Sequence, residues 1–353
     1  MTHLELRPEE YQPQPPERRD YGIGLIGCGG IARGAHLPAY RQAGYRVVAC
    51  CDLDEQAMRQ AQTGFEIPFG TTDVDALLAH PDVEIVDLAV HATQRRPLIE
   101  RIAAAGKAVL SQKPFAMRWE DARHMVEVCE RAGVTLMVNQ QARWAPAHRA
   151  VKVLLDRAVL GHVYSVMHVN RSFQDVPGSW FVALENFNIV DHGIHYIDLS
   201  RFFTGRTPIR VKATTTTVPG QAAVSPMIYS VLCEYEPQAQ VMTTLHFNNI
   251  IAAAGLHRYE WLIDGTEGSL IASQSEVTVC LKADRLTRVT FPIGGRWFPD
   301  AFGGSMGELM QALAERREPE TSGRDNLNTL RIAYAAVESS ETGQAVSLTE
   351  IGD

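Results

Sequence analysis

Two aspartates and two histidines lie among large apolar residues in the segment IVDHGIHYID, residues 189–198. On a helix with 100° between residues, Asp191, His195 and Asp198 fall within about 60° of one another, and His192 points about a quarter turn away. Burying such groups costs free energy unless they are paired or used. The stripe is therefore compatible with a metal site, a proton relay, or a core helix whose polar groups are satisfied.

We favour the proton relay and expect no metal, because no HExxH motif or cysteine cluster supplies further ligands. A histidine suits acid–base chemistry, since its pKa lies near neutral pH. We expect Asp198 to be a structural partner of a nearby arginine such as Arg201. A satisfied core histidine is the alternative reading of His195.

A glycine-rich motif could bind a phosphate. The run GIGLIGCGGIA, residues 22–32, has the pattern G-x-G-x-x-A. Its first glycine permits a tight turn, its second lets the backbone approach a pyrophosphate at the positive end of a helix, and Ala32 keeps helix and strand close. The expected cofactor contacts in this loop are Gly27, Gly29, Gly30 and Ile31.

An acidic residue follows the next apolar run at the distance this motif requires. Asp52 lies 25 residues after Gly27, where its carboxylate would hydrogen-bond the adenosine ribose. The same carboxylate would repel a 2′-phosphate, so NAD is favoured over NADP. Arg33, just after the motif, keeps NADP as an alternative. The alternative is a glycine-rich turn with no ligand.

Short apolar runs alternate with helical patterns in the first part of the chain. This rhythm predicts a doubly wound parallel sheet, with the nucleotide at the carboxyl ends of its strands. The expected strands are residues 22–27, 45–52, 83–90, 107–112 and 134–139, with helices that include 31–44 and 119–133.

Beyond a helix at 146–156, alternating and β-branched runs follow one another from residue 162 to 293. They predict a mostly antiparallel sheet, interrupted by the helix at 189–203 and followed by helices at 303–317 and 325–342. We expect a flexible N-terminal arm (1–20) or a strap onto a neighbouring subunit, a nucleotide-binding domain (21–145) and an α+β domain (146–353). The C-terminal helix could pack back on the nucleotide-binding domain.

Composition excludes several other classes of protein. The 353 residues are 45% hydrophobic and 21% charged, with a formal net charge of −8, which argues against nucleic-acid binding. We expect no membrane span and no signal peptide. The six cysteines have no CxxC spacing, so we expect reduced thiols in a cytoplasmic protein.

These pieces together resemble one known family. The glycine motif, AGKAVLSQKPFA at 105–116, NQQARWAP at 139–146 and the aspartate–x–x–x–histidine helix are similar to those of Gfo/Idh/MocA oxidoreductases. The resemblance covers nearly everything after Tyr21. It implies a Rossmann domain joined to a large open antiparallel sheet that often builds a homodimer or homotetramer interface. It also implies hydride transfer between a nicotinamide and a sugar, inositol or polyol.

The resemblance also implies site residues. The family's Glu-Lys-Pro motif falls on Gln112, Lys113 and Pro114, and its helix aspartate and histidine fall on Asp191 and His195. Two departures concern the nicotinamide surroundings: glutamine replaces the glutamate at 112, and VHATQRRP (90–97) replaces a Thr-Pro-rich loop. We expect catalysis by Lys113, Asp191 and His195, and cofactor contacts from His91, Gln112 and Lys113.

Substrate contacts are expected from side chains that suit hydroxyl-rich ligands. They are Arg143, Trp144, Arg171, Trp180 and His192. Arg95 and Arg96 are expected to be solvated, with contact to the dinucleotide as the alternative. The predicted activity is NAD-dependent oxidation of a secondary alcohol. Reduction of a keto-sugar or another small carbonyl, and a non-catalytic dinucleotide- or sugar-binding regulatory role, remain as alternatives.

Overall fold

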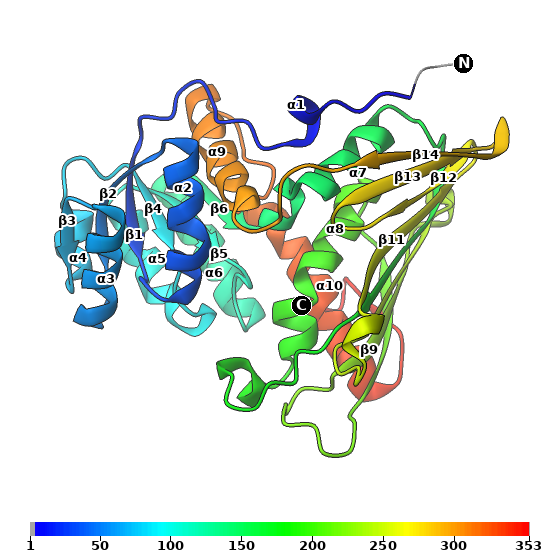
Figure 1. Cartoon of the computed structure of the whole chain (residues 1–353). Helices are drawn as coiled ribbons and strands as arrows, with labels where there is room; N and C mark the ends of the chain where they lie inside the picture. The colour runs from blue at the N-terminus through cyan, green and yellow to red at the C-terminus, as the bar shows by residue number, and fades with distance from the viewer. Residues whose placement is uncertain (1–3, 353) are drawn as a thin grey trace. The chain divides into compact units, whose positions relative to one another are not determined.

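The computed structural model describes residues 4–352, which divide into two compact units, each with its own sheet (Figure 1). The parallel-sheet unit comprises residues 13–145 and 296–327. The antiparallel-sheet unit comprises residues 4–12, 146–295 and 328–352. No helix among residues 4–352 is long and apolar enough to cross a membrane.

The parallel-sheet unit has six strands in the order β3-β2-β1-β4-β5-β6, all paired in parallel. Every residue of β1, β4, β5 and β6 is buried, as expected for strands covered on both faces. The order reverses between β1 and β4, which is where doubly wound sheets bind ligands. The strands are β1 (Gly22–Ile26), β2 (Arg46–Cys51), β3 (Phe69–Thr71), β4 (Ile85–Leu88), β5 (Ala108–Gln112) and β6 (Leu136–Asn139).

The helices of this unit alternate with its strands, which confirms the doubly wound prediction. Asp54 begins one of them by accepting a hydrogen bond from the backbone of Gln56 at 2.8 Å. The elements are η1 (Ala32–His36, a π segment), α2 (Leu37–Ala43), α3 (Glu55–Phe65), α4 (Val74–Leu78), η2 (Ala92–Gln94), α5 (Arg95–Ala104), α6 (Trp119–Ala132) and η3 (Gln141–Trp144).

A helix from late in the chain, α9 (Asp300–Glu315), completes the core of the parallel-sheet unit. Its glycines allow this packing: a Cβ on Gly304 would lie 2.7 Å from the Cβ of Trp144, and one on Gly307 would lie 2.6 Å from the hydroxyl of Tyr45. The predicted boundary at 146–353 therefore differs from the structure, because residues 296–327 group with the first sheet. Sequence periodicity shows that α9 has a buried face but not which sheet it covers.

The antiparallel-sheet unit has nine strands in the order β14-β13-β12-β11-β7-β10-β9-β8-β15. Their pairings are antiparallel except that of β7 with β10, as predicted for a mostly antiparallel sheet. The strands are β7 (Val163–Arg171), β8 (Arg210–Thr216), β9 (Ile228–Glu234), β10 (Met242–Asn248), β11 (Arg258–Gly265), β12 (Gly268–Ala272), β13 (Glu276–Leu281), β14 (Asp284–Pro292) and β15 (Val346–Ser347).

Helices α7 and α8 pack against the inner face of this sheet (Figure 1). The core between them is aromatic, and His168 on β7 stacks on Tyr196 of α8 with ring centroids 4.4 Å apart. The helical elements are α1 (Pro8–Tyr11), α7 (Pro146–Asp156), η4 (Trp180–Ala183), η5 (Phe187–His192, a π segment), α8 (Ile194–Thr204), η6 (Pro237–Ala239), η7 (Ala254–Leu256) and α10 (Gly323–Thr342), whose first turn groups with the other unit.

The described part of the N-terminal arm is folded against its own chain, in contrast to the predicted flexible arm. Arg157 donates to the carbonyl of Glu5 at 2.8 Å and forms an ion pair with Glu10. Tyr11 is 3% exposed, and its hydroxyl accepts a hydrogen bond from the backbone of Gly294. The polar composition that suggested disorder is offset by these few specific contacts.

Candidate active site

The glycine loop follows β1 and has the geometry that a dinucleotide requires. Gly27 has φ 98°, and a Cβ there would lie 2.9 Å from the backbone of Ala89, so only glycine fits. A Cβ on Gly29 or Gly30 would meet nothing within 4 Å, which leaves the backbone open to a ligand. Ile31 is 38% exposed in the same loop. The loop therefore fits a pyrophosphate at the start of the following helix.

Asp52 lies at the carboxyl end of β2 and is tied to the glycine loop. Its Oδ2 accepts a hydrogen bond from the backbone of Cys28 at 2.7 Å, and its Oδ1 accepts one from Asp54 at 2.9 Å. These bonds fix the carboxylate beside the loop, where a ribose would lie. The guanidinium of Arg33 is bound to the side chain of Gln60 on α3.

Lys113 follows β5 at the same edge of the sheet. Its side chain is half-buried, and the Lys113–Pro114 peptide bond is cis, a geometry that the sequence left open. Gln112 is 6% exposed, and its Oε1 accepts a hydrogen bond from the Lys113 backbone at 2.8 Å. His91 is exposed at the start of η2, after β4. The predicted cofactor residues thus meet at the carboxyl ends of β1, β2, β4 and β5.

Arg95 is buried, so the expectation that it is solvated is wrong. It is 2% exposed, and its guanidinium donates to the carbonyls of Val90, Gln112 and Pro114, at 2.7 Å for Val90. Arg96 is exposed, as expected, and pairs with Asp121. The VHATQRRP loop therefore supplies a buried cation, Arg95, that holds the turn around Lys113. Two arginines side by side in the sequence do not show which of them is buried.

In the antiparallel-sheet unit, Asp191 and His192 lie in a π segment, whereas His195 lies in α8. The sequence predicted one continuous helix, so the 100° spacing does not carry over from Asp191 to His195. Asp191 and His192 are half-buried, and His195 is 6% exposed. The three residues remain within five consecutive positions of the chain (191–195), at a wide turn of the kind that often marks functional sites.

His192 is held in a network of amides that the sequence did not single out. Gln174 Nε2 lies 3.1 Å from His192 Nε2, and Asn249 Nδ2 lies 3.4 Å from His192 Nδ1. Asn249 also donates to Asn188 at 2.9 Å and accepts from Ser172 at 3.1 Å. Ser172 and Gln174 follow β7 and Asn249 follows β10, and the parallel pairing of these strands brings their carboxyl ends to one edge, whereas Asn188 lies in η5. Such donors and acceptors suit a ligand rich in hydroxyls.

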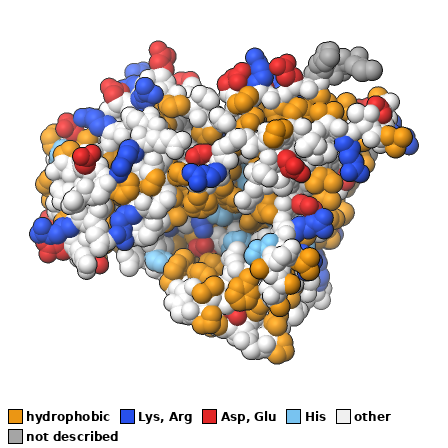
Figure 2. Space-filling view, viewed as in Figure 1, with side chains coloured by type: hydrophobic (Ala, Val, Ile, Leu, Met, Phe, Trp, Pro, Cys, Tyr) orange, Lys and Arg blue, Asp and Glu red, His pale blue; other side chains and the backbone are white. Residues whose placement is uncertain are grey.

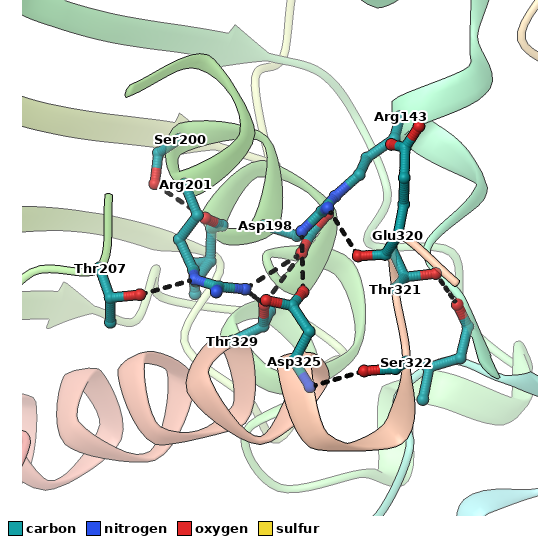
Figure 3. A network of polar contacts seen from close by, with 12 residues as sticks. Arg143, Asp198, Ser200, Arg201, Thr207, Glu320, Thr321, Ser322, Asp325 and Thr329 are labelled. Atoms are coloured by element: carbon teal, nitrogen blue, oxygen red, sulfur yellow. Dashed lines mark hydrogen bonds and ion pairs between the residues drawn. The ribbon is translucent and has the colours of Figure 1, made fainter. Parts of the chain in front are cut away.

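Asp198 has a structural partner, as predicted. Its carboxylate accepts a hydrogen bond from Thr329 at 2.9 Å and lies 3.8 Å from Arg201, which also donates to Thr329 at 2.9 Å (Figure 3). Asp198 therefore belongs to the packing of α8 against α10.

Two predicted substrate contacts have structural partners in the parallel-sheet unit. Arg143 donates to Asp325 and to the carbonyl of Glu320, both at 3.2 Å (Figure 3). Trp144 is 6% exposed and packs in the core with α9. The burial of Trp144 argues against a substrate contact, because a core indole presents no free face to a ligand.

The other predicted contacts lie at the surface of the antiparallel-sheet unit. Arg171 is half-buried at the end of β7, and Trp180 is 56% exposed, edge-on to Phe181 and Phe187. Figure 2 shows hydrophobic side chains gathered at the lower end of this face. Val224 is 59% exposed in the loop between β8 and β9.

Neither a disulfide nor a metal site is present among residues 4–352. All six cysteines are free. Burial raises the pKa of Cys51 to about 11 and that of Cys129 to about 12, so both are protonated thiols at neutral pH. Among residues 4–352 no three His, Cys, Asp or Glu side chains are grouped as a metal ion would require.

A parallel sheet of this strand order, with a glycine loop after β1 and a carboxylate after β2, defines a dinucleotide-binding domain. Residues 21–140 match the "Oxidoreductase family, NAD-binding Rossmann fold", and residues 148–271 match the "GFO/IDH/MocA C-terminal domain". The chain belongs to the Gfo/Idh/MocA family of oxidoreductases.

Individual relatives cover nearly the whole chain. D-apiose dehydrogenase of Paraburkholderia graminis is 32% identical over 338 residues, which are 93% of this chain and 89% of that protein. Inositol 2-dehydrogenase of Rhizobium meliloti is 26% identical over 92% of this chain and 98% of its own length. An Agrobacterium radiobacter oxidoreductase, solved with NAD⁺, L-tartaric acid and magnesium, superposes with a TM-score of 0.84 and 27% identity, covering 94% of this chain and 99% of that one.

Proposed function

We propose that the protein is an NAD-dependent dehydrogenase that oxidises a secondary alcohol of a sugar or polyol. The observation that carries this proposal is the position of Lys113: a cation held at the carboxyl end of β5, at the same edge of the sheet as the glycine loop. The relatives named for D-apiose and inositol support a hydroxyl-rich substrate.

Each group has a chemical role in this proposal. The glycine loop and Asp52 hold the dinucleotide, and the bound nicotinamide supplies the hydride acceptor. Lys113 donates a hydrogen bond to the reacting oxygen and stabilises the charge that develops on it. His195 accepts the hydroxyl proton at its imidazole, and Asp191 orients that ring or the substrate.

The same proposal places substrate hydroxyls against the His192 network and Arg171, with Trp180 presenting an aromatic face to the sugar ring. The amides around His192 provide donors and acceptors in fixed positions. NAD is preferred because the Asp52 carboxylate, held beside the glycine loop, would repel a 2′-phosphate, and because Arg33 is already bound to Gln60.

The test is NADH production at 340 nm with NAD and a panel of D-apiose, inositols, aldoses and anhydrosugars. Lys113→Ala and His195→Ala are expected to lower kcat by about 10²- to 10⁴-fold while NAD still binds. Lys282→Ala and His257→Ala, both at exposed positions, are the matched controls. Turnover that is unchanged in Lys113→Ala and His195→Ala would show that these roles are misassigned.

A reductase is the second candidate, because 1,5-anhydro-D-fructose reductase of Ensifer adhaerens is 26% identical over 92% of this chain. The residues serve either direction, since a base in oxidation is an acid in reduction. NADH consumption with keto-sugars, compared with NADH formation from the matching alcohols, decides between the two directions.

We also propose that the outer face of the large sheet joins two copies of the chain. An apolar row crosses this face in register: Leu232, Met167, Leu262 and Ile271 lie on β9, β7, β11 and β12, with one threonine on β10. Met167 and Ile271 are 38% and 48% exposed. Such a surface favours association with a second copy that offers the same row.

A further inference from the structure

A hydrogen-bonded chain of buried polar side chains leads to the backbone N–H of Lys113. Tyr40 donates to Asp87 Oδ2 at 2.8 Å, and His36 Nδ1 lies 2.7 Å from the same oxygen. The other ring nitrogen, His36 Nε2, lies 3.2 Å from Gln112 Nε2, and Gln112 Oε1 accepts from the Lys113 backbone. Tyr40, His36 and Asp87 are 0% exposed, so water does not compete for these bonds.

Donors and acceptors along this chain fix the state of His36. Because Gln112 Oε1 faces the Lys113 N–H, its NH₂ group faces the histidine and can only donate. His36 Nε2 must therefore accept, and Nδ1 carries the single ring proton, which it donates to Asp87. Burial, and then Asp87, raise the pKa of Tyr40 well above its usual value, so Tyr40 remains a donor to the same carboxylate.

A glutamate at 112, which the family motif carries, would reverse these requirements. Its oxygens could only accept, so His36 would need a proton on both nitrogens, between two carboxylates. The buried chain would then hold two negative charges and one positive charge. With Gln112 it holds the single charge of Asp87. The net charge is −1 in both cases, so a neutral His36 compensates for the loss of the glutamate.

We propose that Gln112 and His36 are positioning residues for Lys113. The Gln112 amide keeps His36 in the neutral Nδ1–H form, and the chain anchored at Asp87 holds the Lys113 N–H in place. Arg95 holds the other side of the turn through the carbonyls of Gln112 and Pro114. The two departures from the family pattern, at 112 and in the 90–97 loop, thus act on one turn. The role given to Lys113 rests on the proposed function, whereas the state of His36 does not.

The described groups that contact His36 come from four elements. They are Tyr40 of α2, Asp87 of β4, Gln112 of β5 and the apolar ring of Phe302 of α9, at 4.7 Å between centroids. Asp87 is the one charged group among these four, so a proton added to His36 has no second carboxylate partner unless residue 112 becomes glutamate.

The first test reads the histidine directly. In the full-length protein labelled with ¹⁵N-histidine, long-range ¹H–¹⁵N correlation at pH 7 is expected to show His36 neutral and protonated at Nδ1. In Gln112→Glu, both nitrogens are expected to be protonated. The His36 signals are assigned by their loss in His36→Gln, whose amide can donate to Asp87 and accept from Gln112. An Nε2–H or doubly protonated His36 in the wild type overturns the inference. So does a neutral His36 in a folded Gln112→Glu.

The second test separates positioning from simple support of the fold. His36→Gln is expected to keep kcat within about threefold of the wild-type value. His36→Leu, which breaks the hydrogen-bonded series from Asp87 to Lys113, is expected to lower kcat by about tenfold to a hundredfold with little change in KM for NAD. Equal kcat values in the two variants would contradict a positioning role. If the wild type turns over no substrate, the proposed function fails while the tautomer result stands. If turnover is normal but the tautomer is wrong, only this inference fails.

Discussion

His168 gives the fold a dependence on pH that can be measured. The side chain is fully buried on β7, with ring centroids 4.4 Å from Tyr196, 4.5 Å from Trp261 and 4.8 Å from Tyr259. Burial, and then the nearby His148 and His192, lower the pKa of His168 well below its usual value. The folded protein therefore holds His168 as a neutral ring at neutral pH.

The sign and size of the effect follow from proton linkage. In the unfolded chain the imidazole takes up a proton near pH 6.5. Between that pH and the lower pKa of the folded state, the unfolded chain binds one more proton, so stability falls as the pH falls. The slope is about 1.4 kcal/mol per pH unit. Between pH 7 and pH 5, His168 should thus remove about 2 kcal/mol from the free energy of unfolding.

The perturbation is His168→Phe, which keeps an aromatic ring and removes two nitrogens that make no hydrogen bond of normal geometry within residues 4–352. Urea unfolding of both proteins at pH 7 and pH 5 gives four free energies. The variant is expected to lose about 2 kcal/mol less than the wild type between these pH values. His257→Phe, at an exposed position, should behave as the wild type. Equal losses in His168→Phe and the wild type would refute the reasoning.

Three further outcomes are expected. Asp52→Ala should raise KM for NAD about tenfold or more and improve the use of NADP, and unchanged selectivity in kinetics with both cofactors would contradict this. Arg95→Lys should lower kcat and reduce the free energy of unfolding by about 1–3 kcal/mol, because one ammonium group cannot satisfy all the carbonyls that the Arg95 guanidinium reaches. The exposed Arg96→Lys should have little effect on either quantity. Met167→Glu should weaken self-association in analytical ultracentrifugation, and Leu53→Glu, at an 83% exposed position in the other unit, should not.

Local signals predicted most of the fold and part of the candidate site. The glycine loop, Lys113 at a strand end and the strands of both sheets, except the short edge strands β3 and β15, each follow from period, turn chemistry and order along the chain. The π segments within helices were not predicted: Ala32–His36 and Phe187–His192 were expected to be ordinary α-helix. A π turn depends on packing that a hydrophobic pattern does not contain.

The sequence by itself determined the class of the molecule: a parallel sheet with a dinucleotide loop, a mostly antiparallel sheet, and candidates for acid–base chemistry. Only the tertiary structure decided which polar groups meet. His36 and Asp87 are 51 residues apart in sequence, and His36 and Gln112 are 76 residues apart. It also decided that Arg95 is buried and that α9 covers the first sheet. The physical reason is that periodicity records whether a side chain is buried, whereas its partner is set by which strands and helices become neighbours.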